Sequence, residues 1–365
     1  MKLTKPLVLG LAAGLAVTAL AVGAPAFSDP VSNSYVLVGS DTLQDSANAL
    51  VNGTDVTGAR VRIKAAGASL ANYDAFPTTG AGSSIQTKPG GVFFPRPSGS
   101  GAGVNALKAS INGTTYLTSA QAITGQVDIA RSSSGPGNNA NDNGLLAYVP
   151  YARDGVAYAY RGDAKLANLT TDQLKAIYQG TLTSVDGVTV KPLIPQADSG
   201  TRKFFLSAIG ATCALTDGSC TTSALAENDA SVLKEDGNII PISAGSWIAQ
   251  SNGVAPSTIP TDGSVKLGSP DGTAPFNGTG TNLVPNATFY NTIYGRDTYL
   301  VVERARITPG NGKYDPALFN LMDQSSATSL TNFITTPDAA GAVKQKFGFV
   351  APKSTAVIFA YATLS

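Results

Sequence analysis

The 365-residue sequence predicts a mixed α/β protein, in which strands and helices alternate along the chain. Short runs rich in β-branched and aromatic residues alternate with segments whose apolar residues recur at helical spacing. Several of these runs end in small polar residues that lead directly into a helical segment, as the strand–turn–helix units of α/β proteins do. The chain is also long enough for two domains with cores of their own.

The expected elements follow from these periodicities. The region 67–97 is rich in Gly, Pro, Thr and Ser, so it predicts loops, with one hairpin around 92–94. The spacing of Thr170 and Gln173 predicts a capping box at the start of a short helix. We expect strands at 35–38, 61–63, 127–130, 148–151, 156–160, 188–194 and 298–302, a strand-like run at 239–248 interrupted by Pro and Gly, and helices that begin near 41, 100, 170 and 200 or centre on 318 and 343.

Residues 1–26 have the pattern of a secretory signal peptide. Lys2 and Lys5 precede an apolar run over 7–22, and Ala24-Pro25-Ala26 fits a small-residue cleavage site. A retained membrane anchor is the competing interpretation, but the apolar run is short for a bilayer span. No cysteine near the cleavage site offers a lipid attachment point, and no second long apolar run follows. The sequence therefore predicts a secreted protein, extracellular or periplasmic, without stable membrane insertion.

Composition excludes several functional classes. Without Lys2 and Lys5 the acidic residues outnumber the basic ones by one, so nucleic acid is not an expected partner. The chain has no histidine, which removes Ser-His-Asp and Cys-His catalysis and histidine metal sites. Cys213 and Cys220 are the only cysteines, and export favours a disulfide between them over a metal pair, since thiolate sites usually need four ligands. We expect a protein that is not an enzyme and needs no metal or cofactor.

The stretch around Asp198-Ser199-Gly200-Thr201-Arg202 is the most informative in the chain. It follows the β-branched run 188–194 and precedes apolar residues at helical spacing. Ser199 is a candidate N-cap, Gly200 allows close approach of the backbone, and Arg202 adds a fixed charge with forked donors. Free backbone N–H groups at such a turn favour an anion site. The alternative is an ordinary capped helix whose arginine is solvated.

Four turns of similar chemistry occur along the chain. Each offers hydroxyls and backbone N–H groups, three lie at expected helix starts, and two include arginine; convergent donors of this kind can hold an oxyanion without a metal. Structural alternatives stay open: Asp41 as a helix N-terminal acid, Arg131 as an ion-pair partner, and Ser100 and Thr201 as caps. The candidate ligands are Asp41, Thr42, Leu43, Ser100, Gly101, Arg131, Ser133, Ser199, Gly200, Thr201 and Arg202.

The order of these motifs resembles the periplasmic phosphate-binding proteins of ABC transporters, and the chain is similar to secreted actinobacterial members. The resemblance covers roughly residues 35–250 well and the C-terminal third loosely. Each motif is short, but their order is fairly specific to the family. The motifs are Gly39-Ser40-Asp41-Thr42-Leu43, Gly99-Ser100-Gly101-Ala102-Gly103, Val127-Asp128-Ile129-Ala130-Arg131-Ser132-Ser133, residues 169–178 and Asp198-Ser199-Gly200-Thr201-Arg202.

The resemblance implies a type II periplasmic-binding-protein-like fold, with two α/β lobes, a hinge and a cleft between them that closes over one anion. Lobe 1 would comprise 29–152 plus 290–365, and lobe 2 would comprise 153–289. The runs 148–151 and 156–160 are candidates to cross between the lobes. The implied partners are inorganic phosphate and an ABC transporter permease, and a monomer is expected. Thr42, Leu43 and Ser100 would bind from lobe 1, and Ser199, Gly200, Thr201 and Arg202 from lobe 2.

One position departs from the family pattern. An Asp that accepts the proton of hydrogen phosphate in that family is replaced here by Ser133, which puts discrimination between phosphate and sulfate in doubt. Asp41 is a candidate to replace that acceptor. The alternatives are a binder of sulfate or of a phosphorylated small molecule, a phosphate-ester hydrolase, which the lack of His and of a carboxylate cluster disfavours, and a non-binding cell-surface protein on the same fold.

Overall fold

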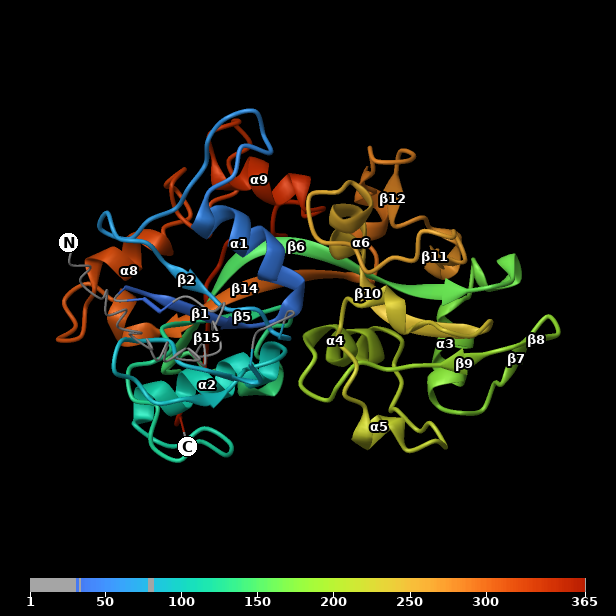
Figure 1. Cartoon of the computed structure of the whole chain (residues 1–365), viewed down its shortest axis with the longest axis horizontal. Helices are drawn as coiled ribbons and strands as arrows, with labels where there is room; N and C mark the ends of the chain where they lie inside the picture. Colours follow the sequence, from blue (N-terminus) through green and yellow to red (C-terminus); the bar gives the residue numbers. More distant parts are fainter. Residues whose placement is uncertain (1–30, 33, 78–81, 365) are drawn as a thin grey trace, which may run out of the picture.

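Two α/β lobes lie side by side in the computed structural model, which describes residues 31–32, 34–77 and 82–364 (Figure 1). The strand β6 (Leu146–Arg161) runs through both lobes and is 16 residues long. It forms because apolar and aromatic residues continue through the run, and nearly all of it is buried. The expected signal peptide, 1–26, lies outside the described residues.

One mixed sheet connects the two lobes. In the described chain it has nine strands, and the path β2-β1-β5-β14-β6-β10-β9 is extended by β11 and β15, which both pair with β6. β1 is parallel to β2 and β5, whereas β14 is antiparallel to β5 and β6. These strands are β1 (Val36–Gly39), β2 (Ala71–Asn72), β5 (Ile129–Ser132), β9 (Lys191–Pro192), β10 (Asn238–Ser243), β11 (Val265–Leu267), β14 (Gly295–Glu303) and β15 (Ile358–Ala360).

Short hairpins and helices complete the lobes. The paired strands β3 (Ser84–Ile85) and β4 (Phe94–Pro95) form the hairpin expected within 67–97. The other short strands are β7 (Ser184–Val185), β8 (Val188–Thr189), β12 (Phe276–Asn277) and β13 (Val284–Pro285). The α-helices are α1 (Gln44–Asn52), α2 (Ser100–Asn112), α3 (Thr171–Tyr178), α4 (Gly200–Ala208), α5 (Ser219–Thr222), α6 (Ala244–Ser251), α7 (Ala287–Tyr290), α8 (Pro316–Leu321) and α9 (Ala340–Lys346). The 3-10 turns are η1 (Asp41–Leu43), η2 (Gly137–Asn139), η3 (Ala164–Leu166), η4 (Ala230–Val232), η5 (Pro270–Gly272) and η6 (Arg304–Ile307).

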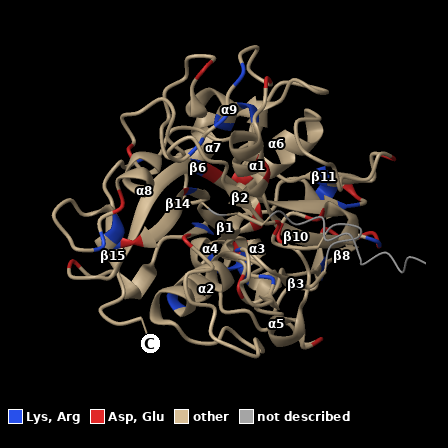
Figure 2. Cartoon of the chain, turned by 60° about the vertical axis from the view of Figure 1, so that its left-hand side comes forward, with Lys and Arg blue, Asp and Glu red and all other residues tan. Residues whose placement is uncertain are grey.

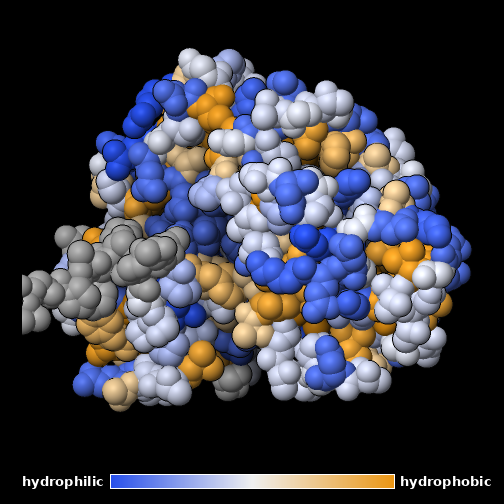
Figure 3. Space-filling view, turned by 45° about the vertical axis from the view of Figure 1, so that its right-hand side comes forward, coloured by the Kyte–Doolittle hydropathy of each residue, from blue (hydrophilic) through white to orange (hydrophobic). Residues whose placement is uncertain are grey.

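The buried apolar residues form separate cores. We call lobe 1 the half whose two core clusters draw on residues 36–152 and 299–364, and lobe 2 the half whose clusters draw on residues 156–294. Ala249 and Ala255 of the second half pack in a lobe 1 cluster, so the lobes also contact each other there. On the face seen in Figure 3, hydrophobic residues occur in small separate groups.

The caps predicted by the sequence are present. The Ser199 side chain accepts a hydrogen bond from the Arg202 N–H at the start of α4. Thr170 and Gln173 form the reciprocal capping box of α3. These caps are local in the chain, which is why residue spacing predicts them.

Three strand expectations were wrong in detail. The run 188–194 divides into β8, which pairs with β7, and β9, which pairs with β10. The run 61–63 makes only a bridge at Val61. The stretch 239–248 changes from β10 to α6 because Ser243 caps the helix, accepting from the Ser246 N–H. In each case the available tertiary partners determine which residues form a strand, and an apolar sequence pattern does not specify those partners.

Candidate functional site

The lobes make direct contact where α4 meets α2. A Cβ atom placed on Gly200 would lie 2.3 Å from the Oγ atoms of both Ser100 and Ser133. The Gly101 N–H of lobe 1 also donates to the Asp198 carbonyl of lobe 2, at 3.1 Å. A side chain at position 200 would force these two serine side chains or the helix starts that carry them to shift. The structure therefore shows the lobes closed on each other.

Beside this contact, a carboxylate of the protein itself occupies the convergent donors. Oε1 of Glu227 accepts from the Ser40 hydroxyl at 3.0 Å, the Asp41 N–H at 3.0 Å and the Thr42 N–H at 3.4 Å. These three donors belong to lobe 1, at the end of β1 and the start of η1. The side chain of Glu227 is buried, with 1% of the residue exposed.

The second oxygen of Glu227 binds lobe 2. Oε2 accepts from the Ser199 hydroxyl at 2.6 Å and from the Thr201 N–H at 3.1 Å. Each oxygen therefore faces at least one backbone N–H group, which can only donate. Among the described residues, five donors from two lobes and two helix starts converge on this one carboxylate. We call these five donors the receptor: they can surround an oxyanion, and in this structure that oxyanion is the Glu227 carboxylate.

A buried arginine lies next to the receptor. Arg296 is 3% exposed, and its Nη2 donates to Thr201 Oγ1 at 2.9 Å and to Thr42 Oγ1 at 3.2 Å. Its charge is paired with Asp154 of β6, at 2.8 Å. Within the described part of the chain, Nη1 of Arg296 is buried without a hydrogen-bond partner. The Nη1 amino group of the guanidinium that contacts the two threonines through Nη2 is therefore unsatisfied.

The two arginines that the sequence singled out lie elsewhere. Every N–H group of Arg131 has an acceptor: the guanidinium donates to the carbonyls of residues 37, 39, 40 and 73 and to the Asn72 side chain. Burial lowers the pKa of Arg131 to about 10, which leaves the group charged at neutral pH. Arg202 donates to the carbonyls of Pro195 and Cys220. In this structure, neither guanidinium donates to Glu227.

The remaining predicted ligands lie around the receptor without contacting Glu227. Ser100 accepts from the Ser133 N–H at 2.9 Å, and the two hydroxyls lie 3.2 Å apart. Leu43 is fully buried in the core of lobe 1. Of the predicted set, Asp41, Thr42, Ser199 and Thr201 supply donors to the carboxylate, and Gly200 allows the close packing.

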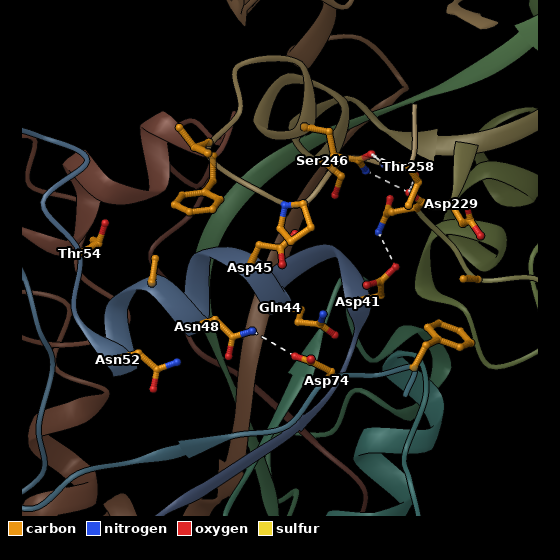
Figure 4. Close-up of a pocket in the computed structure, with 18 of the residues that line it drawn as sticks. Asp41, Gln44, Asp45, Asn48, Asn52, Thr54, Asp74, Asp229, Ser246 and Thr258 are labelled. Atoms are coloured by element: carbon orange, nitrogen blue, oxygen red, sulfur yellow. Dashed lines mark hydrogen bonds between the residues drawn. The ribbon is translucent and has the colours of Figure 1, made fainter. Parts of the chain in front are cut away.

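An acidic cleft of about 600 Å³ borders the receptor (Figure 4). It lies between α1 on one side and the segments 226–229 and 246–258 on the other. Asp41, Asp45, Asp74 and Asp229 line it, together with neutral residues. Figure 2 shows acidic residues on the ribbon near α1. An anion that approaches through this cleft meets negative charge before it reaches the donors.

Two of these carboxyl groups have raised pKa values. Burial, together with the charges of Glu227 and Asp45, raises the pKa of Asp41 to about 8. Burial and the charge of Asp74 raise the pKa of Asp45 to about 6. Below pH 8 the Asp41 carboxyl group is therefore largely protonated: it then carries one donor O–H, while Oδ2 accepts from the Asn228 amide. This argues against Asp41 as the acceptor of a phosphate proton at neutral pH.

Cys213 and Cys220 form the expected disulfide. Arg202 binds the carbonyl of Cys220, so the disulfide loop is attached to α4. In the described part of the chain, no group of three or more His, Cys, Asp or Glu side chains is placed to hold a metal ion. A helix long and apolar enough to cross a bilayer is likewise not found among the described residues.

The comparisons with known proteins agree with this architecture. The sequence profile of the PBP superfamily domain matches residues 32–335. The chain belongs to this superfamily. Among curated protein sequences, none matches the chain.

Solved structures with the same fold include phosphate receptors. An ABC-type phosphate transport receptor from Vibrio cholerae matches with a TM-score of 0.51 and 16% identity, over 87% of this chain and 100% of that chain. A substrate-binding protein attributed to a phosphate ABC transporter, solved with bound phosphate from Clostridium perfringens, matches with a TM-score of 0.52 and 16% identity, over 88% of this chain and 100% of that chain. At this identity the likeness shows the type II periplasmic-binding-protein-like fold.

Sequence reasoning missed Glu227 and Arg296. Glu227 lies in a Glu-Asn-Asp triplet that looks like a helix start, and its contact with Ser40 spans 187 positions. Arg296 is the second residue of β14, three positions before the apolar run 299–302, and its partner Asp154 lies 142 positions away. It stands beside Asp297 at the polar start of that strand, and charged residues are common at strand ends, so the sequence offered no specific signal.

Proposed function

We propose that this chain is a solute-binding protein that takes an inorganic oxyanion, phosphate first, between its two lobes. The observation that carries the proposal is the convergence of donors from both lobes on one buried carboxylate. Because each lobe supplies part of the donors, an anion at this position favours the closed state. The same donors can surround the oxygens of phosphate or sulfate once Glu227 has left.

The identity of the anion rests on the motif order and on the phosphate bound by the Clostridium perfringens relative. Ser133 replaces the family acceptor, and all five groups that contact Glu227 donate to it; three of them are backbone N–H groups, which cannot accept. A site of this kind suits a fully ionised anion. Sulfate and phosphorylated small molecules are therefore the alternative ligands.

We further propose the cellular setting. The signal pattern of 1–26 supports export, and the closed pair of lobes would present a composite surface to an ABC transporter permease. We propose the hinge at the two points where the chain passes between the lobes, within β6 near residue 153 and ahead of β14 near residue 290. Released protein could equally serve as a scavenger of the same anion.

Glu227 favours a second candidate function. A protein whose own carboxylate permanently fills the receptor would bind no solute and would act as a cell-surface protein on this fold. The five hydrogen bonds to Glu227 and its burial are the observations that favour this candidate.

A thermal-shift titration separates these functions. The protein is unfolded, freed of anions, refolded and titrated with phosphate, sulfate, arsenate and a phosphate ester at pH 6 and pH 8. A ligand that binds only the folded state raises the midpoint in step with its concentration. The proposal predicts a rise with phosphate that exceeds any rise with the ester. A flat response to every anion, in both the wild type and E227A, would contradict it.

A further inference from the structure

We propose that Glu227 is a built-in ligand: it holds the lobes closed when no solute is bound, and a solute oxyanion must displace it. The displacement rests on the proposed function, whereas the closing role does not. The proposal starts from the placement of one side chain on donors of both lobes. A group that binds both lobes in the closed state shifts the equilibrium toward that state.

We call residues 226–229 the Glu227 loop, and this loop belongs to lobe 2. On its N-terminal side the Leu225 carbonyl accepts from the Gln196 N–H at 3.0 Å. On its C-terminal side the Ala230 N–H donates to Thr258 Oγ1 at 3.0 Å. The loop is thus fixed at both ends to lobe 2, and only its tip contacts lobe 1.

The next residue strengthens the same bridge. Nδ2 of Asn228 donates to Asp41 Oδ2 at 3.2 Å and to Thr42 Oγ1 at 3.3 Å, while its Oδ1 accepts from the Ser243 N–H of lobe 2 at 3.2 Å. Glu227 and Asn228 therefore bind η1 from neighbouring positions. A two-residue bridge of this kind restrains the lobes in a way that a freely rotating surface side chain would not.

The loop has space in which to move. The acidic cleft of about 600 Å³ is lined on one side by Ala226, Asn228 and Asp229, so open volume lies directly beside the loop. Its fixed ends would keep a displaced Glu227 near the receptor. The displaced carboxylate would then compete with solute at the high local concentration of a short tether.

The receptor is incompletely satisfied with Glu227 in it. Nη1 of Arg296 is buried without a partner in the described chain, although Nη2 of the same guanidinium contacts Thr42 and Thr201. A carboxylate has two oxygens, and both are already bound. A tetrahedral oxyanion has four oxygens and can offer the acceptor that this N–H group lacks. This difference gives a solute oxyanion a means of displacing the internal carboxylate.

Removal of the internal ligand should expose the receptor. We expect E227A to bind phosphate or sulfate at least about tenfold more tightly than the wild type, because competition reduces apparent affinity by the fraction of empty receptor. Both proteins, freed of anions, are titrated by calorimetry with each anion. E235A is the matched control, since Glu235 lies in lobe 2 and pairs with Lys191 at the exposed surface.

Small-angle X-ray scattering on the same anion-free samples tests the closing role separately, because it measures the radius of gyration. E227A should have a larger radius of gyration than the wild type and E235A, and saturating sulfate should reverse the increase. E227Q should behave like E227A because its amide nitrogen would face a backbone N–H group on either side. If E227A folds poorly, E227Q and refolding of E227A in sulfate provide the same comparison, and rescue by sulfate supports the proposal.

The outcomes distinguish the closing role of Glu227 from its displacement by a solute anion. Equal anion affinity in the wild type and E227A would overturn the built-in ligand and leave the proposed function standing. Expansion of E227A without anion binding would support the closing role and overturn the proposed function. If E227A neither expands nor binds an anion, both the closing role and the proposed function are overturned.

Discussion

Arg131 illustrates how a buried guanidinium can be fully satisfied without an anion. All five of its N–H groups have acceptors, and four of these acceptors are backbone carbonyls around the ends of β1 and β2. The arginine thereby fixes the turn that presents the Asp41 and Thr42 N–H groups to Glu227. Its contribution to the site is positional, through the backbone.

Substitution of Arg131 should therefore destabilise the fold strongly. R131A would leave several buried carbonyls without donors, and we expect the free energy of unfolding to fall by about 3–5 kcal/mol. R202A, at a half-buried position with two carbonyl contacts, should cost about 1 kcal/mol. Urea unfolding curves measure both values. A loss in R131A no larger than that in R202A would contradict this role.

Asp41 predicts a pH dependence of stability. A carboxyl group with a raised folded pKa binds its proton more tightly in the folded state, so its contribution is complete below about pH 4. That contribution is lost as the pH rises through about 8, the pKa of Asp41 in the fold. The stability of D41N relative to the wild type should therefore increase between pH 4 and pH 8. Urea unfolding at several pH values measures this, with exposed Asp236 as the D236N control; a constant difference would contradict the raised pKa.

At the scale of the element, the Ser199 hydroxyl at the start of α4 has two roles: it caps the helix and it binds Glu227. Ser199 Oγ accepts from the Arg202 N–H at 3.0 Å and donates to Glu227 Oε2 at 2.6 Å. The hydroxyl geometry allows both at once, since one oxygen is an acceptor and a donor. The cap therefore aligns the helix start and the receptor together.

A double-mutant cycle should separate these tasks. S199A removes the cap and the bond to Glu227, whereas S199A in an E227A background removes the cap alone. We expect a coupling free energy of about 1–3 kcal/mol between the two positions. T170A, which removes only the cap of α3, should cost about 1 kcal/mol. A coupling near zero would show that the contact between Ser199 and Glu227 contributes nothing to folding.

The elements also show where sequence reasoning succeeds. Ser199 and Thr170 were predictable because their partners lie within a few residues, and the helix start at Ser100 was predictable from the spacing of the apolar residues that follow it. Glu227 and Arg296 were not, because their partners lie 26 to 254 positions away and no local pattern encodes them. The sequence therefore predicts the fold class and four of the five receptor residues that donate to Glu227, whereas Glu227 and Arg296 depend on long-range pairing.

At the scale of the whole molecule, the account depends on tight contact between the lobes. Gly200 leaves no room for a methyl group, since a Cβ atom would lie 2.3 Å from two hydroxyl oxygens of lobe 1. The ion pair of Arg296 with Asp154 lies where β14 and β6 pair, so it fixes the crossing strands next to the receptor. Closure and the proposed anion binding thus depend on the same few residues.

G200A should push the lobes apart. We expect a larger radius of gyration and a loss of about 1–3 kcal/mol in the free energy of unfolding, because overpacking forces the surrounding atoms to shift. G312A is the control, since a Cβ atom at Gly312 would meet nothing within 4 Å. Small-angle scattering and urea unfolding measure the two effects. An unchanged radius and stability in G200A would show that the lobes are not held in this contact.

The most direct test of the central claim is a crystal structure of E227A soaked with selenate, whose anomalous scattering locates the anion. The account predicts selenate in the space of the missing carboxylate, bound by the N–H groups of Asp41, Thr42 and Thr201 and by the Ser199 hydroxyl. A peak elsewhere, or an empty space with the donors turned to other partners, would contradict the claim that these residues form an oxyanion receptor.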